Sequence, residues 1–142
     1  MQLYAIPTGN LKLDGGAMFG VVPKSLWSNH YPADENNLIN LAMRCLLVVE
    51  GDRRILINNG IGDKQSEKFF SHYYLNGDDT LLKSLAAVGY QPEDITDMFL
   101  THLHFDHAGG SVKYTADPRG FETVFPNATY WICPPQWEWA MP

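Results

Sequence analysis

Four side chains that bind metal ions well lie close together in the segment "THLHFDHAGG", residues 101–110. The segment holds three of the chain's five histidines, His102, His104 and His107, and Asp106 directly precedes the last of them. Neutral imidazoles and a carboxylate are suitable ligands for zinc, iron or manganese. This density of ligands predicts a metal site, although a histidine-rich surface loop or an adventitious metal site would have the same composition.

The spacing of these ligands indicates two metal ions rather than one. On an extended segment residues two apart point the same way, so His102 and His104 share one side. Asp106 and His107 follow where the chain leaves the strand, and the small residues 108–110 allow a close approach of backbone and metal. A catalytic metal ion normally keeps an open position, so four ligands from one segment are too many for a single ion. We therefore expect one ion on His102 and His104 and another on Asp106 and His107.

The elements around this segment predict a sheet edge. The apolar stretch "DMFL", residues 97–100, predicts a buried strand that brings the ligands to the C-terminal edge of a sheet, where α/β proteins tend to place them. Residues 38–60 predict two strands around the turn "EGDR", and the run "CLLVV" predicts a strand covered on both faces. Residues 2–9 predict a first strand, and residues 10–20 predict a second strand after a hairpin.

The remaining segments predict loops, helices and a late strand. Residues 21–37 read as a loop, whereas residues 63–75 and 78–90 predict helices. Asp79 or Thr80 can cap the second helix and Gly89 can end it; its apolar stripe comprises Leu81, Leu82, Leu85 and Val88. Residues 92–95 predict a helical turn, residues 125–134 a strand, and the end of the chain the start of a helix. The class is therefore mixed α and β.

Composition limits the possible functions. The chain has 142 residues, 45% apolar and 18% charged, which suits one globular domain. The net charge is −6 and no cluster of Lys and Arg occurs, so we expect no nucleic-acid partner. The apolar runs are too short to span a membrane, and "MQLYAIPTG" lacks the features of a signal peptide, so a cytoplasmic location is the default expectation. Cys45 and Cys133 have apolar neighbours and are expected to be buried, reduced thiols.

The histidine segment resembles the His-x-His-x-Asp-His signature of the metallo-β-lactamase fold superfamily. The stretch "ILINNGIGDK", residues 55–64, resembles that superfamily's aspartate-containing motif at a strand end. The stretches "GGAMFGVVPKSLW" and "RCLLVVEGDRRILI" resemble its lactonase-like branch of metal-dependent hydrolases. The resemblance implies an αβ/βα sandwich with metals at one edge. Residues 1–142 would form the N-terminal portion of a single such domain, a mixed sheet with helices packed on one face.

The resemblance also implies a mechanism. His102 and His104 would bind the first metal, and Asp106 and His107 the second; the expected metals are two zinc ions, with iron or manganese as alternatives. A hydroxide bridging the metals would be the nucleophile, because metal ions lower the pKa of bound water to about 7. Asp106 would in addition orient that nucleophile. The implied substrate is a small molecule with an ester, lactone or related bond.

Asn58 departs from the superfamily pattern, which has an aspartate there that supports the metal ligands from behind. A neutral amide can accept a hydrogen bond from an imidazole but supplies no charge, so we expect weaker metal affinity. Alternatively, Asn58 and Asn59 only form the turn before Gly60.

The second departure concerns ligands that the superfamily places downstream of His107. No histidine follows His107, and the one aspartate that does, Asp117, lies in the turn-like "TADPRG". We therefore expect the first half of a sandwich and an incomplete hydrolase. The alternatives are a non-catalytic half-domain that binds metal weakly, or an iron-dependent redox member of the same superfamily.

Half a sandwich would expose one face of its sheet. It would also expose Trp131, Trp137 and Trp139. We expect a second copy of the chain or a C-terminal half to cover that face. His30 and His72 read as surface histidines, although His30 could border the site. Three aromatic residues either line a substrate entrance or pack among themselves: Phe19, Trp27 and Tyr31.

Overall fold

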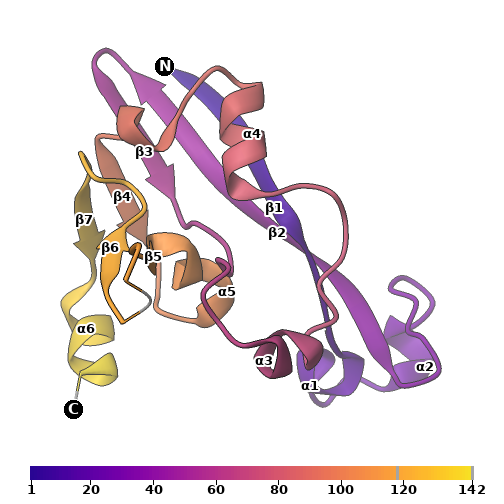
Figure 1. Cartoon of the computed structure of the whole chain (residues 1–142). Helices are drawn as coiled ribbons and strands as arrows, with labels where there is room; N and C mark the ends of the chain where they lie inside the picture. The colour runs from indigo at the N-terminus through magenta and orange to yellow at the C-terminus, as the bar shows by residue number, and fades with distance from the viewer. Residues whose placement is uncertain (118, 142) are drawn as a thin grey trace.

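A five-stranded mixed sheet forms the centre of the molecule (Figure 1). The structure is a computed structural model that describes residues 1–117 and 119–141. The strand order is β1-β2-β3-β4-β7, with bounds β1 Gln2–Asp14, β2 Leu38–Glu50, β3 Arg53–Ile57, β4 Asp97–Leu100 and β7 Thr129–Ile132. Strands β1, β2 and β3 are antiparallel, whereas β3, β4 and β7 run parallel. The predicted mixed sheet of the α/β class is thus confirmed.

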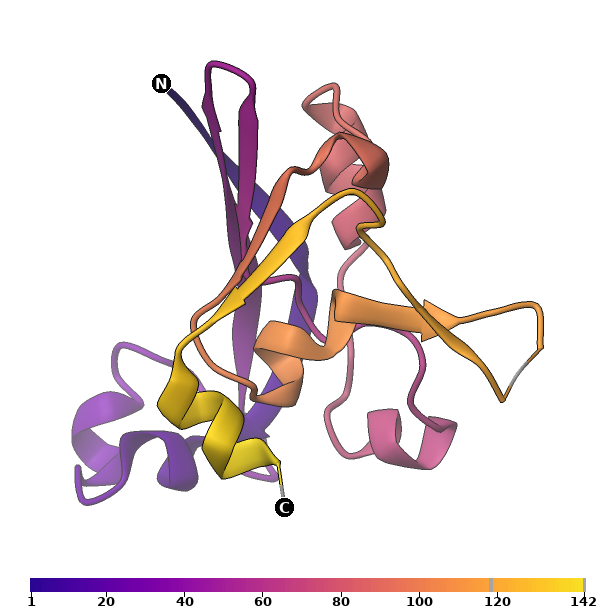
Figure 2. The same cartoon turned by 90° about the vertical axis from the view of Figure 1, so that its left-hand side faces the viewer.

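One face of the sheet carries the main core. Because side chains alternate between the faces of a strand, residues paired across neighbouring strands share a face. One such row holds Tyr4, Leu47, Leu56, Met98 and Tyr130, and it packs with Ile6, Leu85, Ile95 and Phe125. Figure 2 shows α4 (Leu81–Ala87) and the hairpin of β5 (Val112–Tyr114) and β6 (Phe121–Thr123) on the same side of the sheet. Of these elements α4 packs on the core face through Leu81 and Leu85, whereas the hairpin projects away from the sheet.

The other face carries an apolar row that the described residues cover only in part. It runs in register across all five strands through Ala5, Leu46, Ile57, Phe99 and Trp131. Leu46, Phe99 and Trp131 are 36%, 45% and 48% exposed. We call these five residues the apolar row. The exposed face expected of half a sandwich is therefore present, and Trp137 and Trp139 are exposed as well.

Short helices connect the strands. Thr80 caps α4 by accepting a hydrogen bond from the Lys83 amide, and Gly89 follows with a φ of 88°, both as predicted. The other helices are short: α1 Gly15–Phe19, α2 Lys24–Trp27, α3 Glu67–Ser71, α5 Phe105–Ala108 and α6 Pro134–Ala140, with the 3-10 turns η1 Pro92–Asp94 and η2 Gly109–Ser111. Within the described part of the chain, no helix has the length and apolar character needed to cross a membrane.

Several expectations about the elements were wrong. Residues 2–20 do not form a hairpin of two strands; β1 continues to Asp14 and α1 follows. The register shifts between Pro7 and Asn10, so a bulge absorbs Gly9, which has a φ of 100°, and pairing with β2 resumes. The expected loop 21–37 contains α2, and the β5–β6 hairpin was not predicted.

Three predictions of burial were also wrong. The run "CLLVV" is covered on one face only, because its Leu46 belongs to the apolar row. Leu82 is 53% exposed and does not share the buried stripe of α4. Cys45 is buried, but Cys133 is exposed, because it lies where β7 has ended and α6 begins.

Candidate functional site

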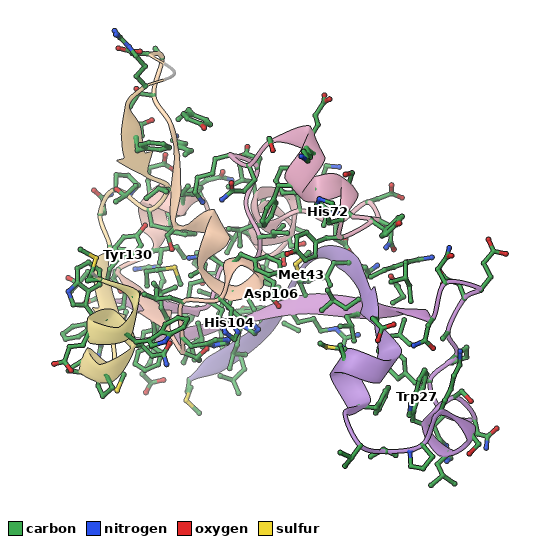
Figure 3. All side chains as sticks on the ribbon, turned by 90° about the horizontal axis from the view of Figure 1, so that it is seen from below. Trp27, Met43, His72, His104, Asp106 and Tyr130 are labelled. Carbon is green, nitrogen blue, oxygen red and sulfur yellow. The ribbon has the colours of Figure 1, made fainter. Side chains whose placement is uncertain are left out.

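The predicted ligands gather just beyond the C-terminal end of β4. The strand ends at Leu100, the chain continues without regular structure, and α5 begins at Phe105. The His107 and Ala108 amides donate to the His104 carbonyl oxygen, which closes the first turn of α5 around the cluster. Asp106 and His107 therefore lie on the helix and His102 and His104 on the segment before it. Figure 3 shows His104 and Asp106 near each other beside Met43.

The four side chains form two pairs. His102 Nε2 lies 3.1 Å from His104 Nδ1, and Asp106 Oδ2 lies 3.4 Å from His107 Nε2. The pairs adjoin, because the ring centroids of His102 and His107 are 4.2 Å apart. The side chains are thus grouped as the spacing led us to expect, and that each pair binds a metal ion stays a prediction.

Each pair has the spacing that one zinc ion requires of two ligands. Two atoms bound tetrahedrally at about 2.0–2.1 Å lie about 3.3 Å from each other. Among residues 1–117 and 119–141, however, no three histidine, cysteine, aspartate or glutamate side chains are grouped as a metal site. The donor set thus fits two incomplete metal sites, each of which needs further ligands.

Asn58 lies directly behind the cluster, at the end of β3. Its Nδ2 is 3.1 Å from His107 Nδ1, and its Oδ1 accepts hydrogen bonds from the backbone amide and the hydroxyl of Thr101 at 3.1 and 3.0 Å. The Thr101 hydroxyl is also 3.0 Å from His102 Nδ1. Asn58 has a φ of 61°, so it makes a turn and contacts a ligand at once. The interpretation that Asn58 only forms the turn is therefore wrong.

The segment after Asn58 holds α5 in place through backbone contacts. The Asn59 amide donates to the His107 carbonyl oxygen at 2.9 Å, and the Gly110 amide donates to the Gly60 carbonyl oxygen at 3.1 Å. A Cβ on Gly109 would lie 2.1 Å from the Ile61 carbonyl oxygen, so this approach requires glycine. Lys64 donates to the carbonyl oxygen of Gly109, and burial lowers the pKa of Lys64 below its ordinary value. The cluster is thereby fixed to the edge of the sheet.

The environment of His102 favours the neutral ring that a metal ligand needs. Desolvation by the surrounding protein lowers the pKa of His102, and the nearby rings of His107 and His104 lower it further, while Asp106 acts in the opposite direction.

Comparison with known proteins identifies this arrangement. The model of the metallo-beta-lactamase superfamily matches residues 44–116, which is more than half of the chain and includes Asn58 and all four predicted ligands. The chain belongs to the metallo-β-lactamase superfamily. The recognition of the signature in the sequence is thus confirmed.

Relatives within the metallo-β-lactamase superfamily include lactonases. The chain is 28% identical over 127 residues to an N-acyl homoserine lactonase of Bacillus cereus, a match that covers 82% of this chain and 46% of that protein. Among solved structures it resembles a probable metal-dependent hydrolase from Staphylococcus aureus, with a TM-score of 0.87 and 37% identity over 96% of this chain and 48% of the other. It also resembles AidC, a dizinc quorum-quenching lactonase, with a TM-score of 0.70 and 28% identity over 96% and 43% of the two chains.

These relatives are longer than the present chain, which spans about half the length of the curated relatives it matches. The lactonase-like branch is supported by both kinds of comparison, and the fold is that of the metallo-β-lactamase superfamily.

The hollows that the described residues line include one beside the cluster and one beside α4. A hollow of about 420 Å³ adjoins the cluster; it is lined by Leu11, Leu41, Ala42, Met43, Arg44, Cys45, Asn58, Asp106 and His107. A larger hollow of about 490 Å³ lies beside α4 and touches none of the four predicted ligands. The smaller hollow is the relevant one, because only it combines open space with the side chains that could do chemistry.

The other candidate residues lie apart from the site. His30 is exposed and follows α2, and His72 is exposed at the end of α3. Phe19 stacks on Trp27 with ring centroids 4.9 Å apart, so these aromatic residues pack among themselves at the far end of the β1–β2 ribbon (Figure 3). Asp117 accepts a hydrogen bond from the Arg119 amide in a turn, as expected.

Thr101 and Lys64 were not singled out in the sequence, although both support the cluster. Thr101 directly precedes His102, and a hydroxyl next to a ligand is a signal that could have been used. Lys64 offered no such signal, because its contact with Gly109 depends on the fold.

Proposed function

We propose that this chain carries the N-terminal half of the metal centre of a zinc-dependent hydrolase that cleaves a lactone or related ester. The observation that supports it most is the pairing of His102 with His104 and of Asp106 with His107 at ligand spacing. The lactonases among the relatives support the reaction class.

In this proposal the first pair holds one zinc ion and the second pair another. Bound zinc supplies a coordinated water of lowered pKa and polarises the carbonyl oxygen of the substrate. Asp106, whose side chain is 25% exposed, lines the smaller hollow, where its carboxylate would accept a hydrogen bond from a water molecule and so orient it. Thr101 and Asn58 hold His102 and His107 from behind.

The substrate is a small molecule with an apolar part. The smaller hollow joins the cluster to Leu11, Leu41 and Met43, which offer an apolar surface for such a group. An N-acyl homoserine lactone combines a lactone ring with an acyl chain, and the Bacillus cereus relative is an N-acyl homoserine lactonase. It is therefore the first substrate class to test.

The remaining metal ligands come from outside the 142 residues. We propose that a C-terminal half or a second copy of the chain packs on the apolar row and brings those ligands to the sheet edge. Residues 1–142 are then the N-terminal portion of a single domain, and metal binding by this portion is weak or partial.

Zinc titration by calorimetry tests this proposal. We expect weak binding that His104→Ala reduces at least tenfold, whereas the exposed His30→Ala leaves it unchanged. Equal loss in both variants, or no zinc binding at all, would contradict the proposal. Bound iron in purified protein would instead favour the redox alternative, and zinc binding without lactone hydrolysis in the assembled protein would favour a non-catalytic half-domain.

A further inference from the structure

Asn58 is the centre of a hydrogen-bond chain whose direction can be worked out from its members. A backbone N–H only donates, so the side-chain atom that faces the Thr101 amide at 3.1 Å has to be the carbonyl oxygen of Asn58. The same oxygen lies 3.0 Å from the Thr101 hydroxyl, which therefore also donates to it. The orientation of the Asn58 amide is fixed by these two donors.

The orientation of the amide determines which nitrogen of His107 carries a proton. With its oxygen on Thr101, Asn58 presents its NH₂ group to His107 Nδ1 at 3.1 Å. An NH₂ group only donates, so Nδ1 accepts and is unprotonated. In a neutral imidazole the proton then resides on Nε2, which faces Asp106 Oδ2 at 3.4 Å.

The opposite arrangement follows for His102. The Thr101 hydroxyl has a single proton, which Asn58 accepts, so its oxygen can only accept at His102 Nδ1, 3.0 Å away. His102 then carries its proton on Nδ1 and keeps a lone pair on Nε2. That nitrogen faces His104 Nδ1 at 3.1 Å, so without metal His104 donates its Nδ1–H to it.

We infer that Asn58 is a positioning residue that sets opposite tautomers on two predicted ligands. His102 is left with an unprotonated Nε2, ready to bind a metal ion. His107 is left with a protonated Nε2. Before it can bind a metal ion, this proton has to pass to solvent while Nδ1 gains one, and the Asn58 amide has to turn its oxygen towards Nδ1. His102 is therefore prepared for metal, whereas His107 is held in a metal-free arrangement. The metal part of this inference rests on the proposed function, whereas the tautomers rest on the hydrogen bonds alone.

An aspartate in place of Asn58 would favour the other tautomer of His107. The carboxylate of Asn58→Asp can accept from Thr101 with one oxygen and from His107 Nδ1–H with the other, which frees Nε2. Aspartate tolerates the positive φ of Asn58, so the variant suits the backbone. Asn36→Asp is a matched control, because it adds the same charge at an exposed position before β2.

Long-range ¹H–¹⁵N NMR of the imidazole rings tests the tautomers without metal or turnover. Spectra are recorded about two pH units above the ordinary histidine pKa of about 6.5, where neutral rings dominate. We expect a protonated Nε2 on His107 and a protonated Nδ1 on His102 in the natural chain. Asn58→Asp moves the His107 proton to Nδ1, and Asn36→Asp does not. Thr101→Val removes the preference of His102 for one tautomer. It keeps the preference of His107, because the backbone amide of residue 101 still orients the Asn58 side chain.

Zinc titration of the same variants then tests the consequence. We expect Asn58→Asp to strengthen binding at the second pair by about 10–100-fold, the range typical for groups that support metal ligands. A natural chain whose His107 carries its proton on Nδ1 would overturn the inference and leave the zinc proposal standing. Unchanged zinc affinity despite a switched tautomer would overturn the claim that Asn58 restrains the second pair. Absence of zinc binding in all variants would overturn the proposed function and leave the tautomers standing.

Discussion

Asp97 shows how strongly a single carboxylate is held at the start of β4. It accepts hydrogen bonds from Arg53 at 2.8 and 3.2 Å, from the Thr96 hydroxyl at 2.7 Å and from Trp131 Nε1 at 2.9 Å. These contacts, first among them that with Arg53, lower the pKa of Asp97 to about 2. Because β4 carries the predicted ligands to the sheet edge, Asp97 links the stability of the sheet to the position of the site.

The first prediction concerns acid. A carboxyl group whose pKa is lowered on folding stabilises the folded state above its unfolded pKa, and this stabilisation is lost as pH falls towards the folded pKa. For Asp97 the loss falls between about pH 4 and about pH 2 and amounts to about 1–2 kcal/mol, since Arg53 is largely exposed. Urea unfolding measured across this range checks it. Asp97→Asn should make the free energy of unfolding less dependent on pH, whereas Asp52→Asn, in an exposed turn, should leave that dependence unchanged. An equal pH dependence in both variants would contradict the role of Asp97.

The second prediction concerns the two thiols. Burial raises the pKa of Cys45 to about 12, so Cys45 offers almost no thiolate at neutral pH, while Cys133 is exposed. A thiol reagent should modify one cysteine per chain rapidly and the second only on unfolding. Mass spectrometry of Cys133→Ser should show the fast reaction lost, and that of Cys45→Ser should show it retained. Rapid modification of both thiols in the folded natural chain would refute this prediction.

At the residue scale, the four candidate ligands could be predicted because they are close in sequence. Local spacing was enough to expect His102 beside His104 and Asp106 beside His107, and their binding of metal ions stays a prediction. The orientation of the Asn58 amide could not be predicted, because it is set by Thr101, which lies 43 residues away along the chain.

At the scale of elements, the site depends on how closely α5 approaches the segment after β3. A Cβ on Gly109 would lie 2.1 Å from the Ile61 carbonyl oxygen, and one on Gly62 would lie 2.4 Å from the Gly109 carbonyl oxygen. Two backbone segments are therefore in direct contact. A side chain added to either of them would move the helix that carries Asp106 and His107.

The third prediction follows from this contact. Gly109→Ala should lower the free energy of unfolding by about 3 kcal/mol, because it overpacks a backbone contact, and should shift the NMR signals of His107. Gly51→Ala is the control: a Cβ there meets nothing within 4 Å, and its φ of 55° costs about 1 kcal/mol. Chemical denaturation of the two variants checks the difference. Equal costs would mean that α5 moves freely relative to the sheet.

Helices and strands were predicted correctly where neighbouring residues determine them, and wrongly where pairing between distant strands determines them. The cap of α4 and the strands on either side of "EGDR" follow from neighbouring residues. Gly9 reads as a turn residue, but β2 pairs with β1 on both sides of it and turns the expected hairpin into a bulge. Leu46 and Leu82 are apolar but lie on exposed faces. The apolar pattern alone does not indicate whether another element covers a face.

At the scale of the whole molecule, the apolar row predicts association. Covering several hundred Å² of apolar surface contributes on the order of 10 kcal/mol at about 25 cal/mol per Å², and such patches usually mark interfaces. The chain alone should dimerise or aggregate, and Phe99→Lys should shift light scattering towards the 16.0 kDa monomer. Leu82→Lys, on the exposed side of α4, should not. A stable monomer of the natural chain at high concentration would contradict this prediction.

The apolar row should also reverse the usual response of fluorescent dyes that bind to exposed apolar surfaces. Such dyes ordinarily brighten when a protein loosens and stay dark on its native form. The members of the row span residues 5 to 131 and line up only when all five strands are in register, so no short peptide or unravelled chain presents it. At concentrations low enough to leave the row uncovered, the native form should therefore be the bright one. Denaturant should extinguish the dye in the same transition that abolishes the circular dichroism of the sheet, and a binding partner that occupies the row should darken it without unfolding anything.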